Sequence, residues 1–160
     1  MIGILLVTHG RLAEELKAAA LTVQPDIPRI VAVALEWHQT GEDAHARIAA
    51  GLAEADEGQG AVILTDMFGG TPTNLTLSFL EHGRVEIVTG VNLPMVLKCA
   101  SLQRGATSAA EMARLARDRG QRSIYVASDL LADEASVSPQ QGNEGEERID
   151  APPAPRGTPE

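Results

Sequence analysis

Short apolar runs alternate with amphipathic stretches along most of the 160-residue chain. Runs such as residues 4–7, in which every residue is a large aliphatic, are typical of strands that are buried on both faces. The stretches between them predict helices, because apolar residues such as Leu12, Leu16 and Ala19 recur at helical spacing. This alternation is typical of strand–helix–strand units. It predicts an α/β fold, with an open, doubly wound, mainly parallel sheet of four strands and flanking helices.

The same pattern predicts where each element lies. The four strands of the sheet are expected at residues 4–7, 29–37, 60–66 and 84–90. Helices are expected from residue 12 onward and at residues 40–56, 71–83, 91–102 and 108–120. One further strand is expected after the last helix, at residues 123–128.

Capping and turn residues predict where several of these helices begin and end. Thr40 is a candidate N-cap, and Thr71 followed by Pro72 is typical of the first residues of a helix. Gly83 and Gly120 are expected to end the helices that precede them.

Composition and charge narrow the class of function. With 44% hydrophobic residues, the chain is long enough to bury the core of one domain of ordinary size. Its formal net charge of -9 disfavours nucleic acid and anionic membranes, because both require a basic surface on the protein. No apolar run approaches the ~20 residues that span a bilayer, and the first strand lacks the features of a signal peptide. We therefore expect a cytoplasmic protein that neither binds nucleic acid nor inserts in a membrane.

Residues 131–160 differ in composition from the rest of the chain. They are rich in Pro, Gly, Gln and Glu and hold few large aliphatic residues, so they cannot bury enough surface to offset the entropy of ordering them. We expect a folded domain over residues 1–130 and a disordered acidic tail over residues 131–160. The single cysteine, Cys99, excludes an internal disulfide and is expected in the core with Met95 and Leu102.

A histidine and an aspartate follow two of the expected strands. His9 comes after the first strand and Asp66 after the third, and functional groups in open parallel sheets gather at the carboxyl ends of the strands. If these two strands are neighbours, as right-handed crossovers allow, the side chains can meet. An aspartate that accepts the Nδ1 proton would fix the tautomer of the imidazole, so that Nε2 becomes a nucleophile near neutral pH. His9 and Asp66 are therefore the candidate catalytic pair.

The sequence FGGTP at residues 68–72 predicts an anion-binding loop. Gly69 and Gly70 would let the backbone approach a ligand closely, and a helix that starts here would offer unpaired N–H groups and the positive end of its dipole. Thr71 would either cap that helix or donate its hydroxyl to the anion. A second such helix start is expected in GVNLPM at residues 90–95. A nucleophilic histidine, an orienting carboxylate and anion-binding helix ends together indicate phosphoryl transfer to histidine.

Other kinds of site lack the residues that they need. The chain has no acidic residues after the first strand to hold the magnesium of a receiver domain, no phosphate-binding loop of P-loop hydrolases and no nucleophile elbow of esterases. A metal site from His9, Asp66 and His38 would lack a closely spaced ligand pair, and we expect neither a metal nor a cofactor. His45 and His82 are expected on polar helix surface or at its end.

Three motifs, taken in order, resemble a known family. They are VTHG after the first strand, LTDMFGGTPTN after the third and GVNLPM after the fourth. Together they are similar to the enzyme IIA component of the mannose family of the bacterial phosphoenolpyruvate-dependent sugar phosphotransferase system. The resemblance extends over roughly residues 2–130, which is the expected folded domain.

The resemblance implies a role for each candidate residue. It implies that His9 accepts a phosphoryl group from the histidine-containing phosphocarrier protein HPr and passes it to a IIB component. It also implies that Asp66 orients His9, and that Gly69, Gly70 and Thr71 lie beside the phosphoryl group. The expected activity is thus that of a phosphotransferase with a phosphohistidine intermediate in sugar uptake.

The resemblance also implies a homodimer and a separate acceptor. In the family, the segment after the last helix contributes a strand to the partner's sheet, and residues 122–130 occupy that position. An exchange of this kind covers a sheet edge that would otherwise stay unpaired. No IIB domain follows the tail, so the expected acceptor is a IIB component on a separate chain.

Three other functions stay open from the sequence. The first is a regulatory phosphohistidine module that takes no part in transport. The second is the phosphotransfer subunit of dihydroxyacetone kinase, although the GGTP sequence at residues 69–72 argues against it. The third is a small-molecule-binding domain of the same fold without covalent chemistry. The sugar does not follow from the sequence, because a IIA component handles only the phosphoryl group.

Overall fold

Four parallel strands form the sheet, in the spatial order β2-β1-β3-β4. The strands are β1 (Gly3–His9), β2 (Val31–Leu35), β3 (Ala61–Thr65) and β4 (Val85–Thr89). The prediction of an open, parallel, doubly wound sheet is confirmed, and β1 and β3 are neighbours as expected. Because all four strands run in the same direction, their carboxyl ends share one edge of the sheet.

The structure, a computed structural model, describes residues 1–36, 38–106 and 108–129. Residues Met1–Ile124 form one compact unit, and the chain from Tyr125 onward belongs to a second. The helices of the first unit are α1 (Leu12–Val23), α2 (Gly41–Ala55), α3 (Thr71–Thr76), the 3₁₀ helix η1 (Leu77–Phe79), α4 (Leu93–Leu102) and α5 (Ala109–Gln121). The expected tail over residues 131–160 lies outside the described residues.

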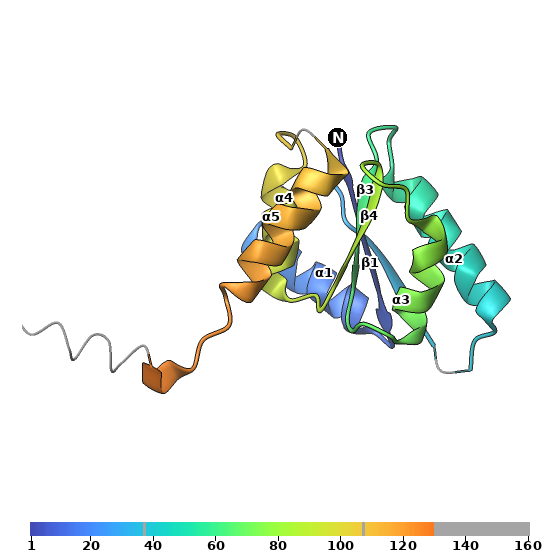
Figure 1. The fold of residues 1–160 in the computed structure, drawn as a ribbon, viewed down its shortest axis with the longest axis horizontal. Coiled ribbons are helices and arrows are strands. Elements are labelled where there is room, and N and C mark those ends of the chain that lie inside the picture. The colour runs from blue at the N-terminus through green and yellow to red at the C-terminus, as the bar shows by residue number, and fades with distance from the viewer. Residues whose placement is uncertain (37, 107, 130–160) are drawn as a thin grey trace, which may run out of the picture. The chain divides into compact units, whose positions relative to one another are not determined.

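Helices cover both faces of the sheet, with α1, α4 and α5 on one face and α2 and α3 on the other (Figure 1). Alternate residues of β1 therefore enter different cores: Ile4 and Leu6 pack with the first group, and Leu5 and Val7 with the second. A strand that is buried on both faces reads as a continuous apolar run, which explains the pattern of residues 4–7.

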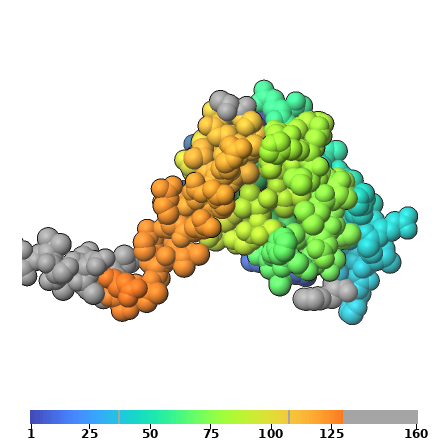
Figure 2. Space-filling view, viewed as in Figure 1, coloured from blue at the N-terminus to red at the C-terminus, as the bar shows by residue number. Residues whose placement is uncertain are grey.

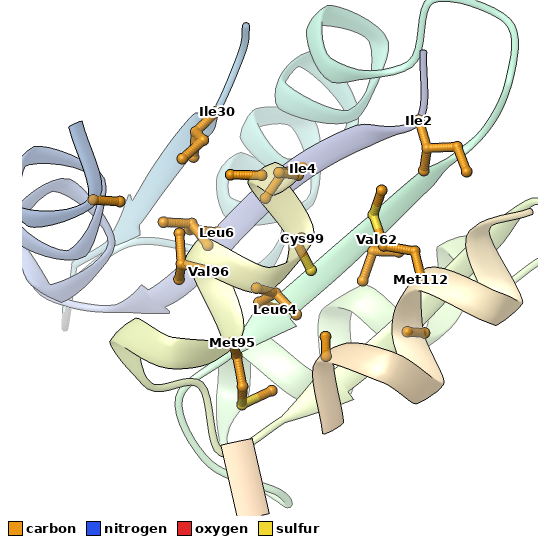
Figure 3. Close-up of a cluster of buried hydrophobic side chains, with 14 of the residues drawn as sticks. Ile2, Ile4, Leu6, Ile30, Val62, Leu64, Met95, Val96, Cys99 and Met112 are labelled. Atoms are coloured by element: carbon orange, nitrogen blue, oxygen red, sulfur yellow. The ribbon is translucent and has the colours of Figure 1, made fainter. Parts of the chain in front are cut away.

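Cys99 lies on α4 in the first of these cores, among apolar side chains that include Val62 and Leu64 (Figure 3). Its side chain is fully buried, and burial raises the pKa of the thiol to about 12. Cys99 is therefore an inert core residue, as predicted.

The third helix is shorter than expected. Gly70 occupies its N-cap and Thr71 is its first residue, so the expected capping role of Thr71 is wrong. The α-helix ends at Thr76 and continues as η1 only to Phe79, so helical structure stops before Gly83. Gly83 instead takes a left-handed conformation in the turn before β4.

Two further details of the helices differ from expectation. Leu12 is 44% exposed, and the buried positions of α1 are Ala13 and Ala20. The last helix ends at Gln121, one residue beyond Gly120. A Cβ built on Gly120 would lie 2.5 Å from Met95 Cγ. Gly120 therefore allows close packing of α5 on α4 and does not end the helix. By contrast, Thr40 caps α2 as predicted and accepts the N–H of Asp43 at 3.1 Å.

The strand expected at residues 123–128 does not form in the single chain. The described residues from Arg122 to Asp129 pair with no strand of the sheet, and Ile124 and Val126 are 75% and 62% exposed. Residues 127–129 are helical, and the backbone N–H groups of Ile124 and Asp129 donate locally, to Gln121 O at 3.4 Å and to Val126 O at 3.0 Å. Exchange of this strand between two chains stays a prediction.

Candidate functional site

His9 and Asp66 meet at the carboxyl edge of the sheet. His9 is the last residue of β1, and Asp66 directly follows β3, which pairs with β1. His9 Nδ1 and Asp66 Oδ2 are 2.8 Å apart, and the same oxygen accepts the backbone N–H of His9 at 3.0 Å. The structure thus brings together the two residues that the sequence singled out, and one carboxylate oxygen fixes both the ring and the end of the strand.

The environment of Asp66 keeps its carboxylate ionised. Burial acts to raise the pKa of Asp66, but hydrogen bonds from the His9 ring, the His9 backbone N–H and the Met67 N–H outweigh it, so the pKa lies below its ordinary value. An ionised carboxylate can only accept hydrogen bonds, so Nδ1 of His9 is the donor. In a neutral imidazole with the proton on Nδ1, the lone pair is on Nε2.

Gly70 lies directly against the His9 ring. A Cβ at this position would lie 2.7 Å from Cε1 and 3.3 Å from Nε2 of His9. A side chain at this position would push the ring aside, so glycine lets the loop pack against the edge of the ring that carries Nε2. Gly69 has φ +79, a left-handed conformation that disfavours side chains. Gly70 is thus next to His9, and Gly69 supplies a left-handed backbone conformation in the same loop.

The predicted second helix start forms at the end of β4, and Asn92 caps it. Asn92 caps α4 by accepting the N–H of Met95 at 3.1 Å, and Val91 N–H donates to Thr65 O at 2.9 Å. These bonds use backbone donors of the loop between β4 and α4. The sequence GVNLPM therefore forms a capped helix start that is tied to the end of β3.

The remaining histidines take no part in the site. His38 is exposed in a turn, and His45 stacks on Phe79 with ring centroids 4.5 Å apart. His82 lies in the turn before β4, not on a helix, and its Nδ1 is 3.3 Å from Glu86 Oε1. Within the residues that the structure describes, no three His, Cys, Asp or Glu side chains gather as metal ligands would.

Sequence reasoning missed three buried threonines that support the site. Thr8 Oγ1 accepts the N–H of Ala13 at 2.7 Å and so holds the start of α1 beside His9. Thr65 and Thr73 share a hydrogen bond of 2.8 Å between their hydroxyls, beneath the loop that carries Asp66. The only signal in the sequence is a threonine at or near the end of an otherwise apolar strand, at residues 8 and 65.

Fold and site together define a class of protein. A doubly wound parallel sheet holds a carboxylate-oriented histidine at its carboxyl edge, next to a glycine loop. A family model described as the PTS system fructose IIA component matches residues 3–116. The chain therefore belongs to the mannose-type enzyme IIA family of the sugar phosphotransferase system (PTS), as its motifs indicated.

Individual relatives agree with this assignment. The chain is 31% identical over 107 residues to the PTS system fructose-specific EIIA component of Bacillus subtilis, covering 64% of this chain and 71% of that protein. It is 24% identical over 139 residues to the PTS system mannose-specific EIIAB component of Escherichia coli K12, covering 86% of this chain but only 43% of that longer protein.

Solved structures share the fold. The mannose/sorbose specific IIA subunit of Enterococcus faecalis superposes with a TM-score of 0.70 at 26% identity, over 79% of this chain and 95% of that one. EIIA from Streptococcus agalactiae superposes with a TM-score of 0.73 at 17% identity, over 81% of this chain and 99% of that one.

Membership of the family gives the protein a phosphotransfer role in the sugar PTS. Among the described residues, every helix is too short or too polar to cross a bilayer.

Proposed function

We propose that the protein is a phosphocarrier that accepts a phosphoryl group from phospho-HPr on Nε2 of His9 and passes it to a IIB component on a separate chain. The observation that carries this proposal is the 2.8 Å bond between His9 Nδ1 and Asp66 Oδ2. It orients a ring that is 22% exposed at the edge of the sheet where partners can approach. Membership of the family supports HPr and IIB as the partners.

The proposed step is a direct transfer between two histidines. The lone pair of His9 Nε2 attacks phosphorus, a P–Nε2 bond forms, and the P–N bond of the donor breaks with its electron pair staying on the donor nitrogen. The Nδ1 proton of His9 stays in its bond to Asp66, so the ring becomes an imidazolium that the carboxylate stabilises. Attack by a nitrogen of the acceptor on the same phosphorus then restores neutral His9.

The loop of Gly69, Gly70 and Thr71 is proposed to lie beside the phosphoryl group. Support comes from the position of Gly70, where a Cβ would lie 3.3 Å from His9 Nε2, because a group attached to Nε2 would then lie next to this loop. The exposed Thr71 hydroxyl, which caps no helix, is then a donor to a phosphoryl oxygen. Its role as a donor replaces the capping role that the structure contradicts.

Intact-mass spectrometry tests the proposal. The protein is incubated with phosphoenolpyruvate, enzyme I and HPr and measured at mildly alkaline pH, where phosphohistidine persists. We expect one added phosphoryl group on the wild type and on the control His82→Ala, whose histidine is exposed, and none on His9→Ala. His9→Ala should stay folded, because His9 is only the last residue of its strand. Phosphorylation of HPr without transfer to the wild type would overturn the proposal.

A further inference from the structure

Two buried hydroxyls connect β3 to the loop that carries Asp66. Thr73 Oγ1 donates to Met67 O at 2.6 Å and lies 2.8 Å from Thr65 Oγ1. The side chains are almost completely inaccessible, with Thr65 0% and Thr73 1% exposed. A hydroxyl has one hydrogen, and Thr73 uses its hydrogen on Met67 O, so Thr65 is the donor between the two threonines.

Hydrogen bonds hold the backbone of Met67 on both its N–H and its C=O side. The N–H of Met67 donates to Asp66 Oδ1 at 3.0 Å, while its carbonyl accepts from Thr73. The other oxygen of Asp66 accepts both bonds from His9. Hydrogen bonds therefore lead from the buried end of β3 through Thr73 to Met67 O, and from Met67 N–H to the carboxylate and then to the His9 ring, with the backbone of Met67 joining the two parts.

We propose that Thr73 is a positioning residue for phosphoryl transfer, an inference that rests on the proposed function of His9. Its hydroxyl fixes the Met67 peptide, which fixes the Asp66 carboxylate and hence the direction of His9 Nε2. Because Thr73 is buried, it acts through Met67 and Asp66 and does not touch the partner protein. A small error in the direction of a nucleophile is costly, since transfer depends almost entirely on positioning.

A set of variants separates this role from ordinary stability. Thr73→Val removes the hydroxyl at nearly constant volume, and Thr73→Ser retains it. Thr76→Val is the matched control, because Thr76 is 0% exposed in the same helix but donates only to Thr73 O, within the helix. We expect Thr73→Val to slow transfer from phospho-HPr about tenfold. Thr73→Ser and Thr76→Val should stay within about twofold of the wild type, although Thr76→Val also loses a buried hydrogen bond.

A second measurement does not require phosphoryl transfer. The ¹⁵N and ¹H resonances of the His9 ring report its hydrogen bond to Asp66, and they should move in Thr73→Val and stay in place in Thr73→Ser and Thr76→Val. If the wild type accepts no phosphoryl group, the proposed function fails, but these resonances still test the positioning role. If Thr73→Val does not fold, Thr73→Ala is measured in its place with the same expectation.

Two results would overturn the inference. One is equal rates and equal His9 resonances in Thr73→Val and Thr76→Val. The other is a Thr73→Ser variant that transfers as slowly as Thr73→Val, which would mean that the methyl group and not the hydroxyl matters.

Discussion

At the scale of single residues, the central pair of the site is predictable from sequence and its supports are not. His9 and Asp66 stand out because each is polar and follows an apolar strand at the same edge of a parallel sheet. The backbone bond from His9 N–H to Asp66 and the buried hydroxyls of Thr65 and Thr73 carry no such signal. They depend on how loops far apart in the sequence meet, and buried threonines are common in sheets.

The prediction at this scale concerns the effect of the Asp66 carboxylate on the rate of transfer. Asp66→Asn should slow transfer from phospho-HPr at least about 100-fold, because a neutral amide cannot stabilise the imidazolium that forms on His9 as the carboxylate does. The measurement is the rate of phosphoryl uptake by intact mass in a rapid-quench series. Asp26→Asn, at an exposed aspartate outside the site, is the control and should react like the wild type. An Asp66→Asn rate equal to that of the control would remove Asp66 from the mechanism.

The same variant has an expected pH dependence of stability. Because the pKa of Asp66 is lowered in the folded state, its contribution to the free energy of unfolding is present above the unfolded pKa of about 3.9 and is lost as pH falls through the folded pKa. Denaturant unfolding from pH 6 downward should therefore show a steeper loss of stability below about pH 4 in the wild type than in Asp66→Asn. Parallel curves would show that the carboxylate gains nothing from its partners.

At the scale of the elements, apolar runs identify the four strands of the sheet because both faces of the sheet are covered. The apolar run at residues 123–128 forms no strand in the described chain, because it has no place in the sheet of one copy. The third helix is predicted too long, since the apolar pattern does not show that it changes to a 3₁₀ helix after Thr76 and ends at Phe79. The sequence also does not show that Gly120 allows α5 to pack closely on α4, since its proximity to Met95 exists only after the two helices pack.

The prediction at this scale concerns Gly70, the N-cap of α3. Gly70→Ala should slow phosphoryl transfer about tenfold or more, because the new Cβ would lie 2.7 Å from His9 Cε1 and the ring must move. Gly41→Ala is the matched control, a glycine at the first position of α2 where a Cβ meets nothing within 4 Å. The measurements are the transfer rate and the thermal midpoint of both variants. A fast Gly70→Ala would show that the ring tolerates a side chain in this loop.

At the scale of the whole molecule, the outer edge of β4 is the feature that one chain leaves unexplained. Beside this edge lies a groove of about 560 Å³, lined by apolar side chains such as Phe68, Leu77 and Leu80 and by Arg114 and Arg117 of α5. Figure 2 shows α5 beside the segment that runs from η1 to β4. Apart from the bridge between Glu81 and Val85, this edge of β4 pairs with no further strand among the described residues, and such an edge next to an apolar groove favours pairing with another chain. The sequence identifies the apolar segment at residues 123–128 but does not identify a partner strand for it.

The exchange of this segment between two chains is the prediction that belongs to the whole molecule. If residues 122–130 pair with β4 of a second copy, Ile124 and Val126 would point to the same face of that strand, and both are exposed in the single chain. The double substitution Ile124→Asp and Val126→Asp should therefore give a monomer in sedimentation equilibrium, while the wild type is a dimer at micromolar concentration. The matched control is Leu21→Asp with Val23→Asp, at exposed apolar positions of α1, and it should stay dimeric. A wild type that is monomeric at every concentration, or a control that dissociates as readily as the test variant, would refute the exchange.

Because Phe68 and Thr73 line the groove and also belong to the loop and helix beside His9, loss of the dimer should also slow phosphoryl transfer.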